Sequence, residues 1–157
     1  MAAGWSGIED RKLFDGSLKH LKEEEGHEFA AVDDIRILDG GSIEDYRRYG
    51  ITGALAQVQF ENLLRNPYYL MGTILPLETL VVETFRPIYQ RLIKVYPGEA
   101  CKMVKIHMDD DPDHVAKGLE QIERCGPDVR KEILSAYDQT AELYRLMIQV
   151  IRENTGA

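Results

Sequence analysis

The sequence has few cysteines, no long apolar run and no basic run, and each absence excludes a class of protein. Cys101 and Cys125 lack CxxC spacing and are too few for a disulfide framework, so we expect reduced, structural thiols and a cytoplasmic protein. No apolar stretch reaches the length of a membrane span, and residues 1–10 lack the basic and apolar parts of a signal peptide. A net charge of −8 without a lysine- or arginine-rich run argues against nucleic acid and anionic membranes as partners.

The chain's 157 residues, 44% of them hydrophobic and 29% charged, predict one soluble domain over residues 1–157 with a sizeable core. Apolar residues recur at helical spacing, and no stretch predicts a pair of strands. Glycine and proline stops delimit helices over about 8–38, 42–64, 67–96, 99–125 and 128–153. Pro76 is expected to kink or split the third helix, and Pro112 to break or loosen the fourth. The prediction is an all-α bundle of about five helices.

The densest set of candidate ligands is the motif His107-x-x-x-Asp111-x-x-His114. Steps of four and three residues return to one face of a helix, so imidazole, carboxylate and imidazole would lie together. Such a set suits a divalent transition metal. A plainer interpretation is an acidic helix start, with Asp111 as N-cap and Pro112 in the first turn. A mononuclear site made by the three motif residues alone is a further alternative.

Two other features point toward the same metal. Glu24 and His27 have the Glu-x-x-His spacing that helical bundles use in diiron sites, although a glutamate-rich run is usually a solvated face. Glu78 lies inside the most apolar segment, where a carboxylate must be neutralised, ion-paired or metal-bound. His20 lies seven residues before His27 and can share its face, but we expect it to be a surface or core-edge histidine.

Taken together, these motifs supply three imidazoles and three carboxylates from three helical regions. The six candidate ligands are Glu24, His27, Glu78, His107, Asp111 and His114. Six nitrogen and oxygen ligands are enough for two iron ions with positions left for oxygen or substrate, whereas one zinc needs three or four. The absence of a cysteine ligand favours iron or manganese over structural zinc.

In these motifs the sequence resembles the haem-oxygenase-like diiron oxidases and oxygenases. That family has a Glu and a His on one helix, a lone Glu on a second, and H-x-x-x-D-x-x-H on a third. The corresponding segments here are LKEEEGHEFAAVDDIRILDGG with Glu24 and His27, NPYYLMGTILPLETL with Glu78, and KIHMDDDPDH with His107, Asp111 and His114. The resemblance covers about Leu18 to Ile122, and the order and spacing of the motifs agree with the family.

The resemblance implies a haem-oxygenase-like helical bundle, often dimeric, that holds two iron ions or a manganese–iron pair. It implies an oxygen-dependent oxidoreductase that decarboxylates, fragments or N-oxygenates a small organic acid or amine, with an external electron donor as a further partner. Members of the family carry a longer region before the Glu/His motif than the 23 residues found here before Glu24, so we expect a bundle shortened at its N-terminus. Their third ligand helix is often irregular or mobile, which fits Pro112.

Two interpretations from other classes stay open on the sequence. A metal-free, thiaminase-like hydrolase would need a nucleophilic cysteine, and neither Cys101 nor Cys125 has an obvious activating context. A helical interaction protein of the same fold would keep a structural or vestigial metal site.

Overall fold

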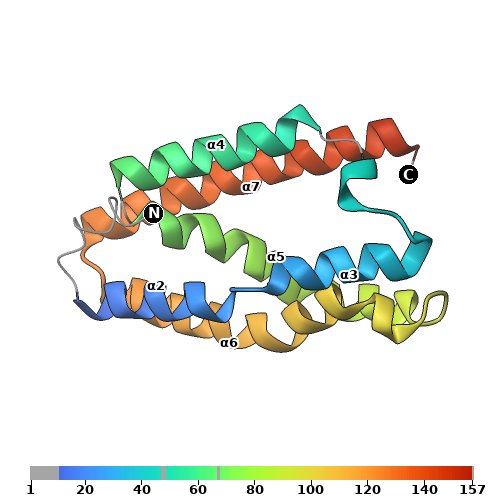
Figure 1. Cartoon of the computed structure of the whole chain (residues 1–157). Helices are drawn as coiled ribbons and strands as arrows, with labels where there is room; N and C mark the ends of the chain where they lie inside the picture. Colours follow the sequence, from blue (N-terminus) through green and yellow to red (C-terminus); the bar gives the residue numbers. More distant parts are fainter. Residues whose placement is uncertain (1–10, 47–48, 67, 157) are drawn as a thin grey trace. The chain divides into compact units, whose positions relative to one another are not determined.

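The computed structural model describes residues 11–46, 49–66 and 68–156, which are helical throughout apart from turns and connections (Figure 1). The α-helices are α2 (Arg11–Glu23), α3 (His27–Asp39), α4 (Gly50–Arg65), α5 (Tyr69–Leu92), α6 (Lys102–Arg124) and α7 (Pro127–Thr155). Two 3-10 turns, η1 (Ile43–Asp45) and η2 (Gly98–Ala100), precede α4 and α6. The described residues contain no strand, so the predicted all-α class is confirmed. None of their helices combines the length and the apolar character that crossing a membrane requires.

Two of the predicted helices are interrupted. The segment predicted as one helix over 8–38 is divided by a turn between α2 and α3, where Gly26 has a left-handed backbone with φ of 98°. Only glycine adopts this conformation at low cost, so a single helix cannot pass through it. The segment predicted over 42–64 divides into η1, closed by a capping box between Ser42 and Asp45, and α4. Residues 8–10, 47–48 and 67 of the predicted helices lie outside the described residues.

Neither proline interrupts its helix, so the expected break at Pro112 and the expected split at Pro76 are both wrong. Pro112 lies inside α6, and Pro76 inside α5. A proline removes one backbone hydrogen bond to the carbonyl four residues earlier. Pro112 is exposed, and Met108 shares its helix face, so water can satisfy the carbonyl that loses its partner. A kink at Pro76 and mobility around Pro112 remain predictions.

The chain divides into two compact units whose boundaries fall inside α2, α5 and α6. The first unit takes the described residues within Met1–Ser17, Arg48–Leu77 and Gly118–Ala157. The second unit takes those within Leu18–Arg47 and Glu78–Lys117. All six predicted metal ligands belong to the second unit. The prediction of one domain over residues 1–157 stays a prediction.

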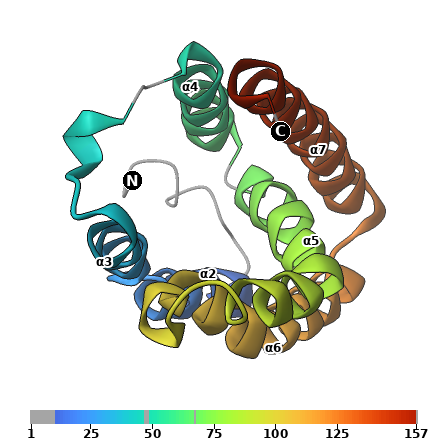
Figure 2. The ribbon, with the colours of Figure 1, turned by 90° about the vertical axis from the view of Figure 1, so that its right-hand side faces the viewer.

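The apolar core of the first unit forms where α5 meets α7. Met71 and Ile133 are buried against each other, with Tyr68, Ile122, Cys125 and Val129 packed around them. In the same unit α4 lies along α7 (Figures 1 and 2). Gly72 permits the close approach of α5 to α7. A Cβ at this position would overlap the carbonyl oxygen of Ile133 and would lie 2.6 Å from the Ala136 Cβ.

Replacing Gly72 by alanine is expected to lower the free energy of unfolding by about 2–3 kcal/mol, because the added methyl meets backbone that cannot move independently. Gly53→Ala is the matched control, since a Cβ at Gly53 in α4 meets no atom within 4 Å. That substitution should be neutral or stabilise by up to about 1 kcal/mol through helix propensity. Urea unfolding followed by circular dichroism measures both. Equal stability of the two variants would contradict the close packing of α5 on α7.

In the second unit, Asp34 fixes the start of α6, the helix that carries three predicted ligands. Its carboxylate accepts hydrogen bonds from the backbone N–H groups of Lys102 at 3.0 Å and Met103 at 2.9 Å. These are the first two residues of α6, whose N–H groups have no partner within the helix. The negative charge also complements the positive end of the helix dipole. A buried aspartate on α3 therefore caps a helix 68 residues further along the chain.

Asp34→Ala is expected to destabilise the metal-free protein by about 2–3 kcal/mol, because it leaves two N–H groups of α6 without their charged acceptor. The neighbouring Asp33 makes only exposed ion pairs, with Arg36 and Lys102, so Asp33→Ala should change stability little. Chemical unfolding of the two variants side by side makes the comparison. An Asp34→Ala protein as stable as Asp33→Ala would show that the cap is unimportant.

The interior of the second unit is unusually polar. Its buried polar side chains are Asp34, Glu78, Asp111 and His114, against Ala30, Ala100 and Cys101 as its buried apolar residues. Buried ionisable groups destabilise a fold unless they are paired, neutralised or bound to a metal. Asp34 has its partners in α6. The other three polar side chains lie together in one cluster.

Candidate metal centre

Seven side chains from α2, the turn that follows it, α3, α5 and α6 converge in the second unit, and they include all four histidines of the sequence. Two sets of them present nitrogen and oxygen atoms within 4.8 Å of one another, a geometry that can hold a metal ion. The first set is His20, Glu24, Glu78 and His114, and the second set is Glu24, His27 and His107. Glu24 belongs to both. The seventh side chain, Asp111, lies between the two histidines of α6.

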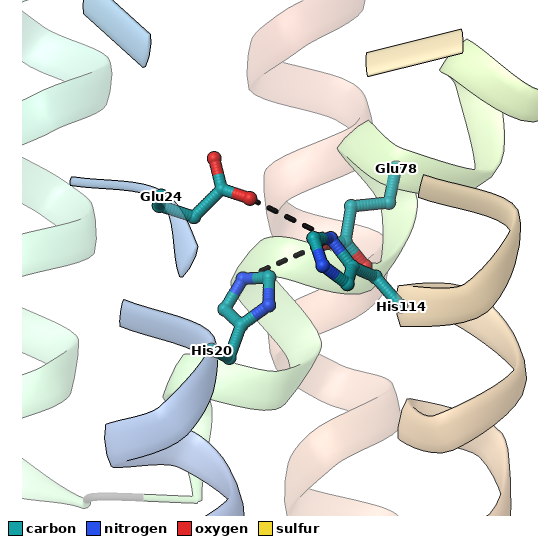
Figure 3. Close-up of side chains that lie close together, drawn as sticks. All are labelled: His20, Glu24, Glu78 and His114. Atoms are coloured by element: carbon teal, nitrogen blue, oxygen red, sulfur yellow. Dashed lines mark ion pairs between the residues drawn. The ribbon is translucent and has the colours of Figure 1, made fainter. Parts of the chain in front are cut away.

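The first set brings the ends of four side chains to one point (Figure 3). His114 Nδ1 lies 3.5 Å from Glu24 Oε1 and 3.5 Å from Glu78 Oε1. His20 Nε2 lies 3.3 Å from the same Glu78 oxygen. Ligand atoms about 2.1 Å from a shared metal ion stand roughly 3.0–3.5 Å from each other, so these separations suit one cation.

Three atoms of the first set are buried and have no hydrogen-bond partner: Glu24 Oε1, Glu78 Oε1 and His114 Nδ1. A buried polar atom without a partner costs about 1–3 kcal/mol, so three in one place require an explanation. All three face one another, and two of them are carboxylate oxygens that repel when ionised. A divalent cation among them would satisfy all three, so the residues present fit a metal ion.

The second set uses the other oxygen of Glu24. His27 Nδ1 lies 3.1 Å from Glu24 Oε2, and the rings of His27 and His107 meet edge to face with centroids 5.0 Å apart. Glu24 Oε1 faces the first set while Oε2 faces the second. One carboxylate therefore reaches both sets, as a carboxylate that bridges two metal ions does.

Asp111 is the most deeply buried charged residue of the cluster, at 1% exposed. Its Oδ1 accepts a hydrogen bond from His107 Nδ1 at 3.1 Å and lies 3.7 Å from His114 Nδ1. The structure brings Asp111 against both histidines of its motif but places it in neither set. Asp111 can serve as a metal ligand, or it can orient the His107 ring through this hydrogen bond.

The turn between α2 and α3 brings Glu24 and His27 together. The Glu24 N–H donates to the His20 carbonyl at 3.0 Å and completes the last turn of α2. The His27 N–H donates in turn to the Glu24 carbonyl at 3.3 Å, and the left-handed Gly26 lies between them. The prediction that Glu24 and His27 share one helix is therefore wrong, although their side chains still meet.

Within the run of three glutamates, only Glu24 belongs to the two sets. Glu25 is exposed. Glu23 Oε2 lies 3.5 Å from His114 Nε2, the ring nitrogen opposite the one that faces Glu78 and Glu24. A carboxylate on the far nitrogen of a metal-ligating histidine fixes the ring's orientation and tautomer, and Glu23 has this position.

Burial and crowding of like charges shape the electrostatics of the cluster. Desolvation, together with the nearby Asp111 and Glu24 carboxylates, raises the pKa of Glu78 to about 8. Burial, together with neighbouring His114, lowers the pKa of His20. The hydrogen bond to Asp111 raises the pKa of His107. The metal-free cluster therefore holds a protonated Glu78 near neutral pH, and a bound cation would displace that proton.

Glu78→Gln is expected to stabilise the metal-free protein strongly at pH 8 and little at pH 5. Below pH 4.5 the carboxyl group is protonated in both folded and unfolded chains, so it contributes no pH dependence. Between pH 4.5 and about 8 the unfolded chain ionises while the folded chain keeps the proton. Stability then falls as pH rises, by up to about 1.4 kcal/mol per pH unit, and glutamine removes this loss.

Melting temperatures in the presence of a chelator at the two pH values test this, with Glu83→Gln on the exposed side of α5 as control. Glu83→Gln should shift the melting temperature by a similar small amount at both pH values. A Glu78→Gln effect that is the same at pH 5 and pH 8 would show that Glu78 is ionised in the folded protein.

His20 is the member of the cluster that the sequence led us to leave out. We expected a surface or core-edge histidine, but its ring lies inside the first set and meets His114 edge to face, with centroids 4.7 Å apart. The spacing of the histidines in the sequence gave one indication that His20 could belong to the cluster. His20 and His27 are seven residues apart, and so are His107 and His114.

The two cysteines are not part of the cluster. They form no disulfide, as expected. The Cys101 thiol is buried and directed at the Pro97 carbonyl, and the Cys125 thiol donates to the Gln121 carbonyl at 3.4 Å. Thiols that interact with backbone of the preceding helical turn have the surroundings of structural cysteines, which disfavours the thiaminase-like alternative.

Comparison with known proteins leaves this cluster as the main guide to function. The chain matches no protein-family model, no curated protein and no solved structure. The resemblance to the haem-oxygenase-like diiron proteins therefore rests on the motifs alone.

Proposed function

We propose that the chain is a dinuclear iron protein that uses dioxygen to oxidise a small organic acid or amine. The observation that carries the proposal is the pair of ligand sets that share Glu24, with three buried atoms left without hydrogen-bond partners. The order of the motifs, which resembles that of the haem-oxygenase-like diiron oxidases and oxygenases, supports the choice of iron and of oxygen chemistry. Bound iron would supply the activation of dioxygen, which amino-acid side chains cannot perform.

The residues of the cluster have distinct roles in this proposal. Glu78 and His114 would hold one ion, His27 and His107 would hold the other, and Glu24, which belongs to both sets, would be shared between them. The carboxylates of Glu24, Glu78 and Asp111 offset the cationic charge, and the neutral imidazoles leave the ions reactive. Glu23 orients the His114 ring, and Asp111 orients the His107 ring or completes its ion's ligands.

The burial of the cluster supports a protected reaction site. Glu78 and His114 are 8% and 9% exposed, so bulk water reaches the first set poorly. Restricted access strengthens electrostatic interactions inside the site and protects reactive species from side reactions. A substrate of the proposed class would bring its own carboxylate or amine as a further partner for the metal ions.

The proposal is tested by loading the metal-free protein with iron(II) under anaerobic conditions and measuring bound iron and oxygen uptake. We expect two irons per chain, and oxygen consumption that rises when a panel of small acids and amines is added. Iron that binds at two per chain without oxygen uptake would favour the structural-metal interpretation. A folded protein that binds fewer than two irons per chain would overturn the dinuclear proposal.

A further inference from the structure

We propose that His20 is a metal ligand, so that the centre has four imidazoles and each ion receives two of them. The inference rests on the proposed dinuclear function and adds a residue that the family motifs do not contain. His20 would complete the first set, giving that ion His20 and His114 as nitrogen ligands with Glu24 and Glu78 as oxygen ligands (Figure 3).

The position of the His20 ring supports ligation. Its side chain is 18% exposed, and its Nε2 lies 3.3 Å from Glu78 Oε1, an atom with no hydrogen-bond partner. The same oxygen lies 3.5 Å from His114 Nδ1, which also lacks a partner. Three potential ligand atoms from α2, α5 and α6 thus surround one point. Two of them, Glu78 Oε1 and His114 Nδ1, have no hydrogen-bond partner.

The pairing of the four histidines gives a second, independent argument. His20 meets His114 edge to face, and His27 meets His107 in the same way. Each pair joins one histidine from the α2–α3 segment with one from α6, in reversed chain order. His20 and His27 are seven residues apart in the sequence, and so are His107 and His114. The two histidine pairs therefore repeat one arrangement, in which His20 has the place beside His114 that His27 has beside His107.

A purely structural role for His20 would be a hydrogen bond to Glu78. In that case its loss would disturb Glu78 and lower the stability of the fold, but it would leave the coordination of each ion unchanged. If His20 is a metal ligand, its loss has a different effect. Loss of the imidazole should weaken one ion selectively and change the spectrum of that ion.

Cobalt(II) is a suitable reporter, because it binds nitrogen and oxygen sites and its visible absorption reports the number and type of ligands. We expect the wild-type protein to bind two cobalt ions per chain. His20→Ala and His20→Gln should each weaken one of the two by at least about tenfold, since even outer-shell partners of a ligand have effects of that size. His20→Glu should retain two ions with a changed spectrum, because a carboxylate replaces the imidazole.

Lys22→Ala, a change of an exposed residue two positions after His20, is the control and should leave both ions unchanged. Two double variants assign the affected ion. His20→Ala with His114→Ala should lose only one ion, because both residues serve the same set. His20→Ala with His27→Ala should weaken both ions, because the two residues serve different sets.

The outcomes separate the inference from the proposed function. Wild-type protein that binds fewer than two ions would overturn the dinuclear function, and the four-imidazole centre with it. Wild-type protein that binds two ions, with His20→Ala and His20→Gln unchanged in affinity and spectrum, would overturn the role of His20 alone. Circular dichroism of each metal-free variant establishes that it is folded before the titration.

Discussion

Glu24→Ala is expected to abolish the binding of both irons, whereas Glu78→Ala should remove only one. Glu24 is the residue common to the two ligand sets, with Oε1 beside His114 and Oε2 beside His27. Without it the first set keeps one carboxylate and the second keeps none, so the negative charge that holds the cations falls sharply. Glu78 contributes to the first set alone. Iron content after anaerobic loading and desalting measures the effect.

Glu25→Ala provides the control for this experiment, because Glu25 is the exposed neighbour and belongs to neither set. It should retain two irons per chain. Retention of one tightly bound iron by Glu24→Ala would show that the two sets are independent and that Glu24 does not bridge them. Loss of both irons from Glu78→Ala would show that the sets cannot be occupied separately.

Iron(II) is expected to raise the melting temperature of the protein by about 10–20 °C when it is present at about 100 times its dissociation constant. Each site then contributes about 2.7 kcal/mol, so two sites contribute about 5 kcal/mol. For a chain of this length, 1 kcal/mol corresponds to roughly 2–4 °C. The physical origin lies in the second unit, where Glu78, Asp111 and His114 are buried together. Bound metal ions would offset the free-energy cost of burying these polar groups.

Thermal unfolding under anaerobic conditions, with and without iron(II), measures the shift. Glu24→Ala serves as the matched protein that should show no shift at the same iron concentration. A wild-type melting temperature that iron(II) leaves unchanged would mean that the polar interior has some other function. An equal shift in wild type and Glu24→Ala would mean that iron acts elsewhere on the chain.

Local sequence signals predicted the helical class well and the helix continuity less well. Apolar spacing and the stops at Gly40 and Gly126 predicted helices that the structure contains. The division at Gly26 was missed, because an isolated glycine inside a helical pattern is usually tolerated and only its left-handed backbone reveals the turn. The expectation that Pro76 and Pro112 would interrupt their helices gave too much weight to proline. At the exposed Pro112, water can solvate the carbonyl that loses its partner, and this compensates for the single lost hydrogen bond.

The sequence predicted those residues of the candidate centre whose spacing or apolar surroundings mark them as ligands. The steps from His107 to Asp111 and His114 placed three side chains on one face, and α6 does carry them together. Glu78 stood out as a carboxylate in an apolar segment, and it is buried. These inferences needed only helical periodicity and the cost of burying charge.

The sharing of Glu24 and the inclusion of His20 required three-dimensional information. Spacing gives the face of a helix but not which face of another helix meets it, so the crossed pairing of His20 with His114 was invisible in the sequence. The choice of Glu24 over its neighbours depends on the turn at Gly26, which sets where each carboxylate points. The equal spacing of the two histidine pairs was visible, and it becomes informative only once the pairs are known to meet.

The central claim is that one buried cluster holds two metal ions linked by Glu24. The most direct measurement is anomalous diffraction at the iron absorption edge from crystals of the iron(II)-loaded protein. We expect two anomalous peaks, one beside His20, Glu78 and His114 and the other beside His27 and His107, with Glu24 between them. A single peak, peaks outside the cluster, or an iron-loaded crystal with no peak among these side chains would contradict it.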